Sequence, residues 1–469
     1  MGAGESEALI EEGDTKIYFP PNIDKSEVFY NPVQNFNRDI TCLVLQAYNN
    51  RVKKPTNLFE AFAATGLRSI RYAREVTGFN SITANDIDKN AGSIIDRNIQ
   101  LNKVDNIVKS SLGDANKVMN SHKGEYQIID LDPYSTVSIF LDAAIHAAAD
   151  GALLCVTSTD GRTLCGQQQE VSYGWYNVMV LNTEFCHEIG IRTLLTLIKQ
   201  IAARYKKTIE PLISLAANFY FRVFVIVHGK SNETKHLASD NAYLLFSPDS
   251  HLFWLQPLGR DMSKGENITV KPAQVTIPSF KDPYTESQLQ LGGPIYTGPI
   301  HNKEFIQSLI DLLPTMKFFK TTARIEAVLN SCIRELDSPF YYDISVLTGI
   351  IHSSTPSREI LVSILEKLGY KTSGTHCKPG MLKTDAPGEL IWDILRRWYF
   401  ENDQKKLPEQ DNSAKKILSA KQSTENKFTF EVDPEVKERI RLEKKICKFY
   451  MNPEKNFGPK AAAKKQKNK

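Results

Sequence analysis

The chain has 469 residues, of which 41% are hydrophobic and 24% are charged, a composition typical of a soluble globular protein with two or three domains. No apolar run reaches the length of a bilayer span, which argues against a membrane protein. The seven cysteines include no Cys-x-x-Cys pair, so we expect no structural zinc site. Scattered cysteines in a chain without a secretory leader indicate a reducing compartment.

The net charge of +4 is unevenly distributed along the chain. Residues 401–469 hold 18 Lys and Arg against 11 Asp and Glu, whereas residues 1–400 hold 40 against 43. A basic tail with few aromatic residues is typical of a nucleic-acid-binding arm or a nuclear address, and it can also serve only for solubility. The acids near the amino terminus argue against a mitochondrial presequence at the start.

The first 50 residues are expected to form the amino-terminal segment of a larger domain, with a short strand at residues 16–19 and a helix at about residues 37–48. That helix carries Arg38. Residues 57–68 then have the pattern of a strand, a tight turn and a helix start. Gly66 and its small neighbours in that turn let a ligand approach the backbone closely.

An acidic residue follows each of the next strands. Residues 81–86 form the second predicted strand, which ends in Asp86, 20 residues after Gly66. An acid at this spacing is the usual acceptor for ribose hydroxyls in a Rossmann-type site. After a helix at residues 89–101 and a strand at residues 104–110, Asp114 is placed to accept from an adenine amino group.

The fourth strand, at residues 127–131, leads directly into Asp132-Pro133-Tyr134. Pro133 cannot donate to a strand ladder and stiffens the turn, so Asp132 and Tyr134 are expected at the carboxyl end of the strand, where open α/β sheets bind ligands. A carboxylate beside an aromatic ring suits chemistry on the exocyclic amine of a flat base. An ordinary turn with a solvated Asp is the alternative.

The glycine pattern narrows the choice of cofactor. The chain has no Gly-x-Gly-x-x-Gly and no Walker A lysine motif, so a pyrophosphate cradle is missing. A single Gly66 followed by acids at strand ends fits S-adenosylmethionine better, since this cofactor has ribose and adenine but no phosphate. A Rossmann domain that binds no cofactor is the alternative.

The remaining segments predict the rest of the architecture. We expect a helix at residues 138–149, a strand at 151–157 and a mobile polar loop at 159–175. A long helix at residues 184–205 and an apolar strand at 219–228 follow. A hairpin is predicted at residues 241–254 and a Pro/Gly-rich domain junction at 272–299. Residues 300–400 alternate helices with short strands. A charged helix is predicted at residues 435–450, and residues 459–469 are expected to be disordered.

Several strings together resemble the tRNA (guanine-26-N2)-dimethyltransferase family. The similarity extends over roughly residues 15–400, far beyond one motif. The strings are Phe29-Tyr30-Asn31-Pro32, Asn37-Arg38-Asp39, Ala64-Thr65-Gly66-Leu67-Arg68-Ser69-Ile70-Arg71, Asn85-Asp86, Gly113-Asp114-Ala115, Asp130-Leu131-Asp132-Pro133-Tyr134, Leu164-Cys165-Gly166, Thr183-Glu184-Phe185-Cys186-His187-Glu188, Gln256-Pro257-Leu258-Gly259, Thr375-His376 and Lys383-Thr384-Asp385-Ala386-Pro387.

The resemblance implies an α/β protein with a Rossmann-like class I S-adenosylmethionine-dependent methyltransferase domain, a smaller α+β carboxyl-terminal domain and a basic tail. The expected divisions are the amino-terminal segment 1–50, the methyltransferase domain 51–270, the tRNA-binding carboxyl-terminal domain 271–400 and the partly disordered tail 401–469. The implied activity transfers one and then two methyl groups to the exocyclic N2 of guanosine 26 in tRNA. We expect a nuclear location, with mitochondrion and cytoplasm as alternatives.

The resemblance also implies roles for individual residues. Asp132 is the expected catalytic acceptor on the guanine amine, and Phe29 and Tyr134 are expected to stack on the base. For the cofactor, the implied contacts are Arg38 and Arg68 with the methionine carboxylate, Asp86 with the ribose, and Asp114 together with the Ala115 backbone with the adenine. Beyond tRNA, we expect no membrane and no obligate protein partner.

Two departures from the family pattern qualify these expectations. Relatives carry cysteine pairs in the region that matches residues 243–258, which has no cysteine here, so we expect no zinc. Gly374 stands where relatives usually have Arg, which puts one carboxyl-terminal contact in doubt. Two other functions stay open: an N-methyltransferase on another planar amine, such as DNA adenine or a protein glutamine, and a non-catalytic tRNA-binding or chaperone protein. Enzymes of the first kind usually carry Asn/Asp-Pro-Pro-Tyr, and Asp132-Pro133-Tyr134 lacks the second Pro.

Overall fold

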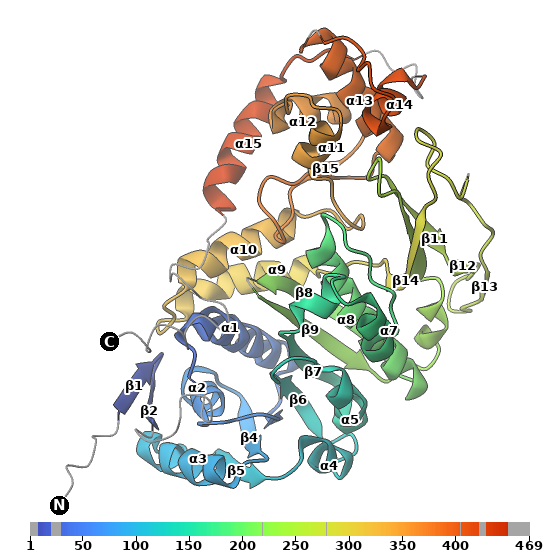
Figure 1. Cartoon of the computed structure of the whole chain (residues 1–469). Coiled ribbons are helices and arrows are strands. Elements are labelled where there is room, and N and C mark those ends of the chain that lie inside the picture. The colour runs from blue at the N-terminus through green and yellow to red at the C-terminus, as the bar shows by residue number, and fades with distance from the viewer. Residues whose placement is uncertain are drawn as a thin grey trace, which may run out of the picture.

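The computed structural model describes residues 8–19, 30–217, 219–277, 279–403, 405–421 and 428–448. A seven-stranded sheet lies at its centre (Figure 1). Its strands are β3 (Thr56–Glu60), β4 (Phe79–Asp86), β5 (Val108–Leu112), β6 (Tyr126–Leu131), β7 (Ala148–Ser158), β8 (Thr208–Ala217) and β9 (Tyr220–His228). They are arranged in the order β5-β4-β3-β6-β7-β9-β8, and only β9 runs antiparallel to its neighbours. The predicted α/β class is confirmed.

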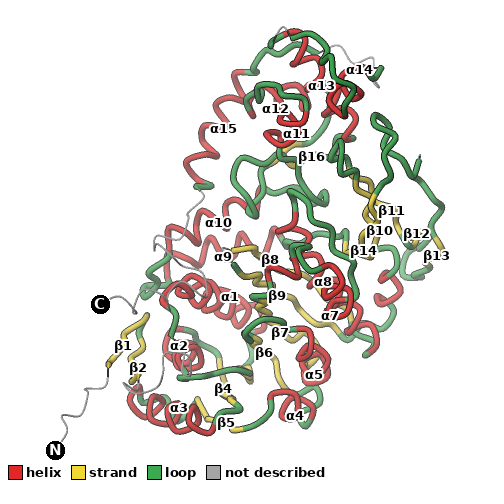
Figure 2. The backbone as a smooth tube through the Cα atoms, in the orientation of Figure 1, coloured by secondary structure: helices red, strands yellow, loops and turns green. Residues whose placement is uncertain are grey.

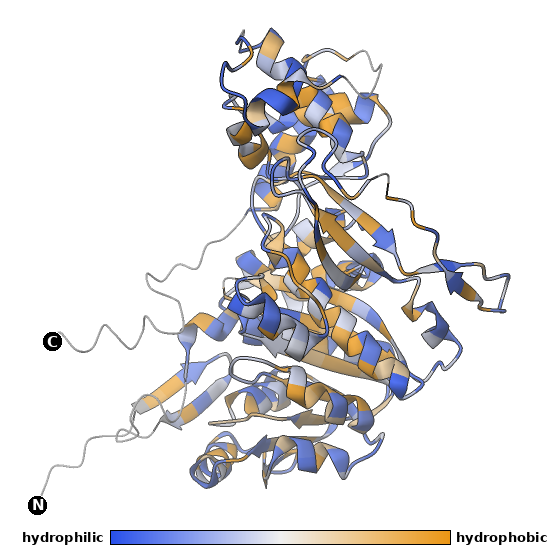
Figure 3. Cartoon of the chain, turned by 45° about the vertical axis from the view of Figure 1, so that its right-hand side comes forward, coloured by the Kyte–Doolittle hydropathy of each residue, from blue (hydrophilic) through white to orange (hydrophobic). Residues whose placement is uncertain are grey.

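Helices cover both faces of this sheet. One face is covered by α1 (Asn35–Val52), α2 (Leu67–Glu75) and α3 (Lys89–Asn102), and the other by α4 (Ala115–Asn120), α5 (Leu141–Ala147) and α8 (Cys186–Arg204). Successive strand residues point to opposite faces, so Leu58 belongs to one apolar core and Phe59 to the other. Strands buried on both sides therefore have nearly continuous apolar sequences, which Figure 3 shows in the central strands.

The strand order reverses between β3 and β6. From β3 the chain proceeds to β4 and β5 on one side, and then returns to place β6 on the other side of β3. Ligands in open α/β sheets bind at such a reversal, outside the carboxyl ends of the strands. The loops that follow β3 and β6 therefore form the expected ligand-binding edge.

A second, smaller sheet contains β10 (Asn241–Phe246), β11 (Phe253–Pro257) and β14 (Gln290–Tyr296), so the hairpin predicted at residues 241–254 is confirmed. β14 pairs with β10 across the predicted 270/271 domain boundary, which therefore lies inside this unit. The following helices, α9 (Lys303–Leu312) and α10 (Thr322–Arg334), pack against α1 and extend its apolar core.

The remaining carboxyl-terminal elements form a mostly helical unit, which Figure 2 shows in red above the central sheet. Its elements are α11 (Ile344–Ile350), α12 (Arg358–Lys367), β15 (Thr372–Ser373), β16 (Lys383–Thr384), α13 (Gly388–Glu401), α14 (Ser413–Ser419) and α15 (Pro434–Ile446). The prediction of a separate tail from residue 401 is wrong for α14 and α15, because Ile417, Leu418, Val436 and Ile440 are buried in the core of this unit. Residues 459–469, predicted to be disordered, lie outside the described residues.

Residues 159–175 were expected to form a mobile polar loop, but most of them are helical. They contain two short helices, α6 (Gly161–Leu164) and α7 (Gln169–Tyr176). The aromatic end of α7 anchors them, since the fully buried Tyr176 hydroxyl lies 2.8 Å from Thr136 Oγ1 and 3.3 Å from Ser158 Oγ. This segment is therefore a fixed wall beside the carboxyl end of β7.

The outer edge of the central sheet is covered by residues from the carboxyl-terminal half. β8 is the last strand, and its outward N–H groups at Ser214 and Ala216 donate to the imidazoles of His301, at 3.5 Å, and His376, at 3.4 Å. Asn302 also donates its backbone N–H to the Leu212 carbonyl. These contacts satisfy backbone groups that an edge strand otherwise leaves unpaired. None of the described helices combines the length and the apolarity that a bilayer span requires.

Candidate active site at the carboxyl edge of the sheet

The loop between β3 and α2 is held in place by its neighbours on both sides. Ala61 donates its N–H to the Asp130 carbonyl at 3.0 Å, and Ala63 donates to the Asn85 carbonyl at 2.8 Å. Gly66, with φ of +78°, turns the chain into α2, and a side chain there would meet Ile95 at 3.3 Å. The glycine is therefore required by both the backbone conformation and the close approach of α3.

Asp86 lies at the end of β4, as predicted, and it accepts two backbone hydrogen bonds. Its Oδ2 accepts from Ala64 N–H at 2.8 Å, and its Oδ1 accepts from Asp88 N–H at 3.0 Å. A carboxylate oxygen can accept more than one hydrogen bond, so both oxygens retain capacity for a ligand. The carboxylate is thus fixed beside the loop and still able to bind hydroxyl groups.

The neighbouring Asn85 connects three strand ends, a role that the sequence did not reveal. Its fully buried amide donates to the carbonyls of Ala61 and Gly113 at 3.2 and 3.1 Å. Asp114 follows as the N-cap of α4 and accepts from Asn116 N–H at 2.9 Å, while Ala115 is buried. The predicted ribose and adenine residues therefore lie on adjacent, mutually bonded loops.

Asp132 and Arg68 form an ion pair at the point where the strand order reverses. Arg68 Nη2 binds Asp132 Oδ2, and both side chains are largely buried. The other terminal nitrogen of Arg68, Nη1, is buried and has no hydrogen-bond partner among the described residues. A buried guanidinium nitrogen with no acceptor is costly, so this geometry favours an anionic ligand group beside the pair.

A layer of buried charges lies beneath this pair. Asp130 accepts from Tyr72 Oη at 2.6 Å and pairs with Arg222 at 2.8 Å. Glu60 accepts from Ser69 N–H at 3.0 Å, and burial, helped by the nearby Asp130, raises the pKa of Glu60 to about 8. Glu60 is therefore mostly protonated at neutral pH.

The residues expected to stack on the base are only partly described. Tyr134 follows Asp132 on the turn and is 72% exposed, and Phe29 lies outside the described residues. Arg38 does not lie free at the site: its guanidinium makes two hydrogen bonds to Glu12 and one to the Asn31 carbonyl. Its role towards a cofactor stays a prediction.

A cavity of about 910 Å³ lies between β8, β9, α10, α12 and the loop of residues 374–381. Six basic side chains line it, outnumbering two acidic ones, Glu359 and Glu443. The six are Arg324, Arg334, Arg358, Lys378, Lys444 and Lys448. Such an excess of cations along a cavity suits a polyanionic ligand.

Tyr220 links the cavity to the carboxyl edge of the sheet. It lines the cavity, and its buried hydroxyl has no hydrogen-bond partner in the part of the chain that the structure describes. Burial raises the pKa of this phenol. The charge of Asp132 at the edge raises this pKa further, and the charge of Arg324 in the cavity opposes this. Sequence reasoning missed Tyr220, because only the pairing of β9 with β7 brings it to this edge.

Gly374 also lines the cavity, and a guanidinium lies beside it. A side chain at residue 374 would begin 3.4 Å from Nη2 of Arg358, which belongs to α12. The position where relatives usually have Arg is therefore next to a positive charge supplied from another helix. Arg358 additionally lies 3.6 Å from Glu443.

A buried polar network joins the sheet to the carboxyl-terminal unit. Lys383 pairs with Glu188 at 3.0 Å and with Glu335 at 2.9 Å, and His376 Nδ1 lies 2.7 Å from Glu335. Although burial opposes it, Lys383 and His376 hold the pKa of Glu335 well below its usual range. Arg192 pairs with Glu188 at 2.8 Å and completes the charge balance.

The site fits S-adenosylmethionine on the chemistry of its donors. The unpartnered Arg68 Nη1 suits a carboxylate, and the Asp86 oxygens suit vicinal hydroxyls. The fixed loop at Ala63 and Ala64 leaves no glycine-rich phosphate cradle, in agreement with a cofactor that lacks phosphate.

Comparisons with known proteins all indicate one family. The family model for N2,N2-dimethylguanosine tRNA methyltransferase matches residues 4–396. A tRNA (guanine(26)-N(2))-dimethyltransferase of Caenorhabditis elegans is 33% identical over 98% of this chain and 93% of its own length. The mitochondrial enzyme of that name from Saccharomyces cerevisiae is 34% identical over 97% and 92%. The solved structure of Trm1 from Pyrococcus horikoshii with S-adenosyl-L-methionine has a TM-score of 0.70 and 28% identity, over 82% of this chain and 98% of that one.

Proposed function

The chain belongs to the N2,N2-dimethylguanosine tRNA methyltransferase family, and from this premise we propose how its own residues carry out the reaction. It is a tRNA (guanine-26-N2)-dimethyltransferase that uses S-adenosylmethionine. The observation that carries the proposed mechanism is the Arg68–Asp132 pair at the strand reversal. A methyltransferase acting on DNA adenine or a protein glutamine, and a non-catalytic chaperone, are less consistent with the family match.

Four residues of the sheet edge are proposed to hold the cofactor. Arg68 binds its carboxylate through the unpartnered Nη1, and Asp86 accepts from its ribose hydroxyls. Asp114 and the backbone of Ala115, on the next loop, face its adenine. When bound, the cofactor supplies an electrophilic methyl group on a sulfonium. Arg38 is proposed to assist at the carboxylate only if its pair with Glu12 opens.

Asp132 is proposed to act directly on the guanine amine. This amine is a weak nucleophile because its lone pair is delocalised into the ring, so its orientation matters most. Arg68 fixes the Asp132 carboxylate, which accepts an N–H of the amine and takes a proton as the nitrogen becomes positively charged. Tyr134 and Phe29 are proposed to stack on the extruded base.

The basic cavity is proposed to bind the tRNA backbone next to the site. Its six cations lie on α10, on α12, on α15 and just after it, and in the loop at Lys378, all in the carboxyl-terminal half, and Tyr220 joins the cavity to the Asp132 edge. Phosphates bound there would place the nucleotide to be methylated near Asp132. Lysines in residues 449–469 are proposed to add non-specific affinity.

The cellular location is proposed to be the nucleus, supported by the lysine-rich end of the chain. The yeast relative described as mitochondrial makes that organelle the main alternative. No obligate protein partner is proposed.

Nucleoside mass spectrometry of unmodified tRNA incubated with the full chain and S-adenosylmethionine tests this function. We expect N2-methylguanosine followed by N2,N2-dimethylguanosine, confined to position 26. A tRNA with adenosine at position 26 serves as the control and should gain no methyl group. Methylation of adenine, or of protein glutamine alone, would overturn the proposal.

A further inference from the structure

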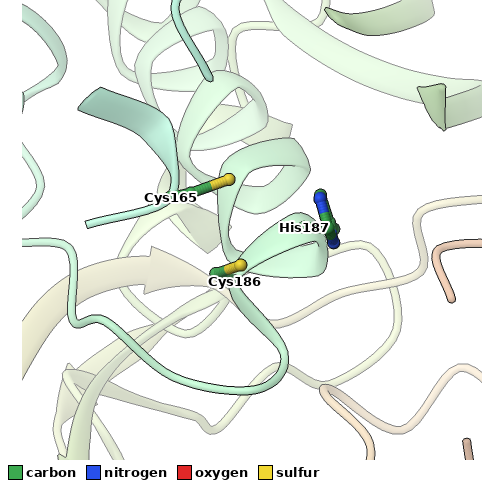
Figure 4. A group of neighbouring side chains, drawn as sticks. All are labelled: Cys165, Cys186 and His187. Atoms are coloured by element: carbon green, nitrogen blue, oxygen red, sulfur yellow. The ribbon is translucent and has the colours of Figure 1, made fainter. Parts of the chain in front are cut away.

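Two cysteines and a histidine from separate segments meet beside the cavity. They are Cys165, Cys186 and His187, and one ligand atom from each lies within 4.8 Å of the other two. Figure 4 shows both sulfur atoms pointing towards the side where the His187 ring lies. Cys165 follows α6, whereas Cys186 and His187 begin α8, so 20 intervening residues fold back to form the group.

A close backbone approach brings the two segments together. Gly166 adopts φ of +77°, and a side chain on it would lie 2.7 Å from the backbone of Leu181 and Asn182. Because no other residue fits there without displacing that backbone, Gly166 fixes Cys165 against the chain that leads into Cys186. The arrangement is therefore built into the fold and does not depend on flexible surface side chains.

The group has donor atoms left without a protein partner. His187 Nδ1 is buried and accepts or donates no hydrogen bond within the described part of the chain. Lys378, whose charge acts on both Cys186 and His187, is already paired with Asp343 at 2.7 Å. A buried, unpartnered imidazole nitrogen beside two thiols is costly unless something binds it.

A second histidine and cysteine group provides an internal contrast. His301, Cys332 and His376 also lie within 4.8 Å of one another and are fully buried. Both of these imidazoles, however, already accept from the N–H groups of β8, and His376 also contacts Glu335. The other ring nitrogens face Glu335, His376 Nδ1 at 2.7 Å and His301 Nε2 at 3.7 Å, so this group already has a carboxylate partner and is not a comparable candidate.

We propose that Cys165, Cys186 and His187 bind a zinc ion, with the fourth coordination position facing the cavity. Zinc prefers thiolate and imidazole ligands in a tetrahedron, whose ligand atoms lie about 3.3–3.8 Å apart. The ligand atoms now lie within 4.8 Å of one another, and side-chain rotations that move each by about 1 Å bring them to that spacing. Cys165 and His187 both line the cavity, so a water molecule can occupy the fourth position.

Such an ion would link α6 to the start of α8. The linked segment follows the carboxyl end of β7 and carries the wall formed by α6 and α7. The proposed site is distinct from the region of residues 243–258, where relatives carry cysteine pairs and this chain has none. The expectation of no zinc, drawn from the lack of a Cys-x-x-Cys pair and from the lack of cysteines in that region, does not address ligands gathered from distant positions.

The first test uses the wild-type chain, purified under reducing conditions and stripped of metal with a chelator. Zn²⁺ is added back in equilibrium dialysis, and bound metal is measured by mass spectrometry. We expect about one equivalent of tightly bound zinc. Co²⁺ in its place should give a thiolate-to-metal charge-transfer band. Alkylation mapped by peptide mass spectrometry should show that Zn²⁺ protects Cys165 and Cys186 but not Cys447.

The second test compares variants that differ in one sulfur. Cys165→Ser and Cys186→Ser should each lower zinc affinity at least tenfold and weaken the cobalt charge-transfer band. Cys447→Ser is the matched control, because Cys447 is a partly exposed cysteine of the same cavity outside the group. It should bind zinc as the wild type does. Thermal unfolding of each metal-free variant identifies any that fail to fold, and the alkylation result then decides.

Three outcomes would overturn the proposal. The first is that the wild-type chain binds zinc no more tightly than Cys186→Ser does. The second is that Zn²⁺ leaves the alkylation of Cys165 and Cys186 unchanged, as it does that of Cys447. The third is a disulfide between Cys165 and Cys186 that persists after purification under reducing conditions and chelator treatment, since it would leave no thiolate for a metal.

Discussion

The carboxyl edge of the sheet and the network around Glu335 both gather buried charges, but they use them differently. Within the described parts of the chain, Asp86 at the edge accepts only backbone N–H groups, and Arg68 keeps one nitrogen without a partner. In the network, Lys383 bridges Glu188 and Glu335, and His376 completes the set. The first arrangement leaves binding capacity, whereas the second consumes it.

This difference separates a ligand site from a structural joint without reference to any family. A buried charge that is fully paired holds elements in register, whereas a buried charge with unpaired donor atoms can bind a ligand. The comparison predicts that substitutions at the edge affect mainly catalysis and binding. Substitutions in the network should affect mainly stability.

The largest effect is expected at Asp132. Asp132→Asn keeps the size of the side chain but removes the charge that accepts the amine proton, so dimethylguanosine formation should fall about 10²- to 10⁴-fold. Calorimetric binding of S-adenosylmethionine should stay near the wild-type value. Asp142→Asn, on the exposed side of α5, is the control. Turnover within twofold of the wild type would remove Asp132 from the mechanism.

The network should give the largest loss of stability. Lys383→Met leaves Glu188 and Glu335 buried without their shared cation, so the free energy of unfolding should fall by about 3–5 kcal/mol. Guanidinium unfolding followed by circular dichroism measures it. Lys378→Met removes the more exposed pair with Asp343 and should cost less than about 1 kcal/mol. Similar losses in both variants would contradict the comparison.

A smaller effect is expected on the cofactor constant at Asp86. Asp86→Ala removes the proposed ribose acceptor and the hydrogen-bond acceptor of Ala64 N–H. The binding free energy of S-adenosylmethionine should therefore weaken by about 1–3 kcal/mol, which raises its Kd roughly 5- to 150-fold. Asp86→Asn retains one oxygen for Ala64 and should lie between the two. An unchanged Kd in Asp86→Ala would place the ribose elsewhere.

Glu60 should make stability depend on pH. Its pKa is about 8 in the folded chain against 4.5 for an ordinary glutamate, so the folded state holds the proton more tightly than the unfolded state. The stabilisation that the protonated Glu60 gives to the folded state is fully present below pH 4.5 and is lost as the pH rises towards 8. The unfolding free energy of the wild type should therefore fall by a few kcal/mol relative to Glu60→Gln over this interval. A constant difference would contradict the raised pKa.

The smallest effect is expected in the cavity. Arg358→Ala should weaken tRNA binding a few-fold and reduce the slope of log affinity against log salt by about 0.9 for one lost phosphate contact. Arg441→Ala is the control, because Arg441 pairs with Glu438 on an exposed helix face away from the cavity lining. Equal salt slopes for both variants would exclude Arg358 from the tRNA contact.

The sequence predicted the edge well because each of its residues lies next to a strand end. Gly66, Asp86 and Asp132 follow apolar runs within a few positions, so local pattern and sheet topology place them together. Asn85 and Tyr220 were missed because their roles depend on which strands become neighbours. α14 and α15 were assigned to a tail because their many charges hide a narrow apolar stripe.

The covering of β8 has a consequence for any shortened form of this protein. A chain that ends before His301 would lose both imidazoles and Asn302, leaving the outer N–H and C=O groups of a ten-residue strand open to solvent. Such an exposed edge readily recruits a strand from another molecule, so the sheet half made alone should self-associate and aggregate. The carboxyl-terminal half thus protects the central sheet from pairing with other molecules at this edge.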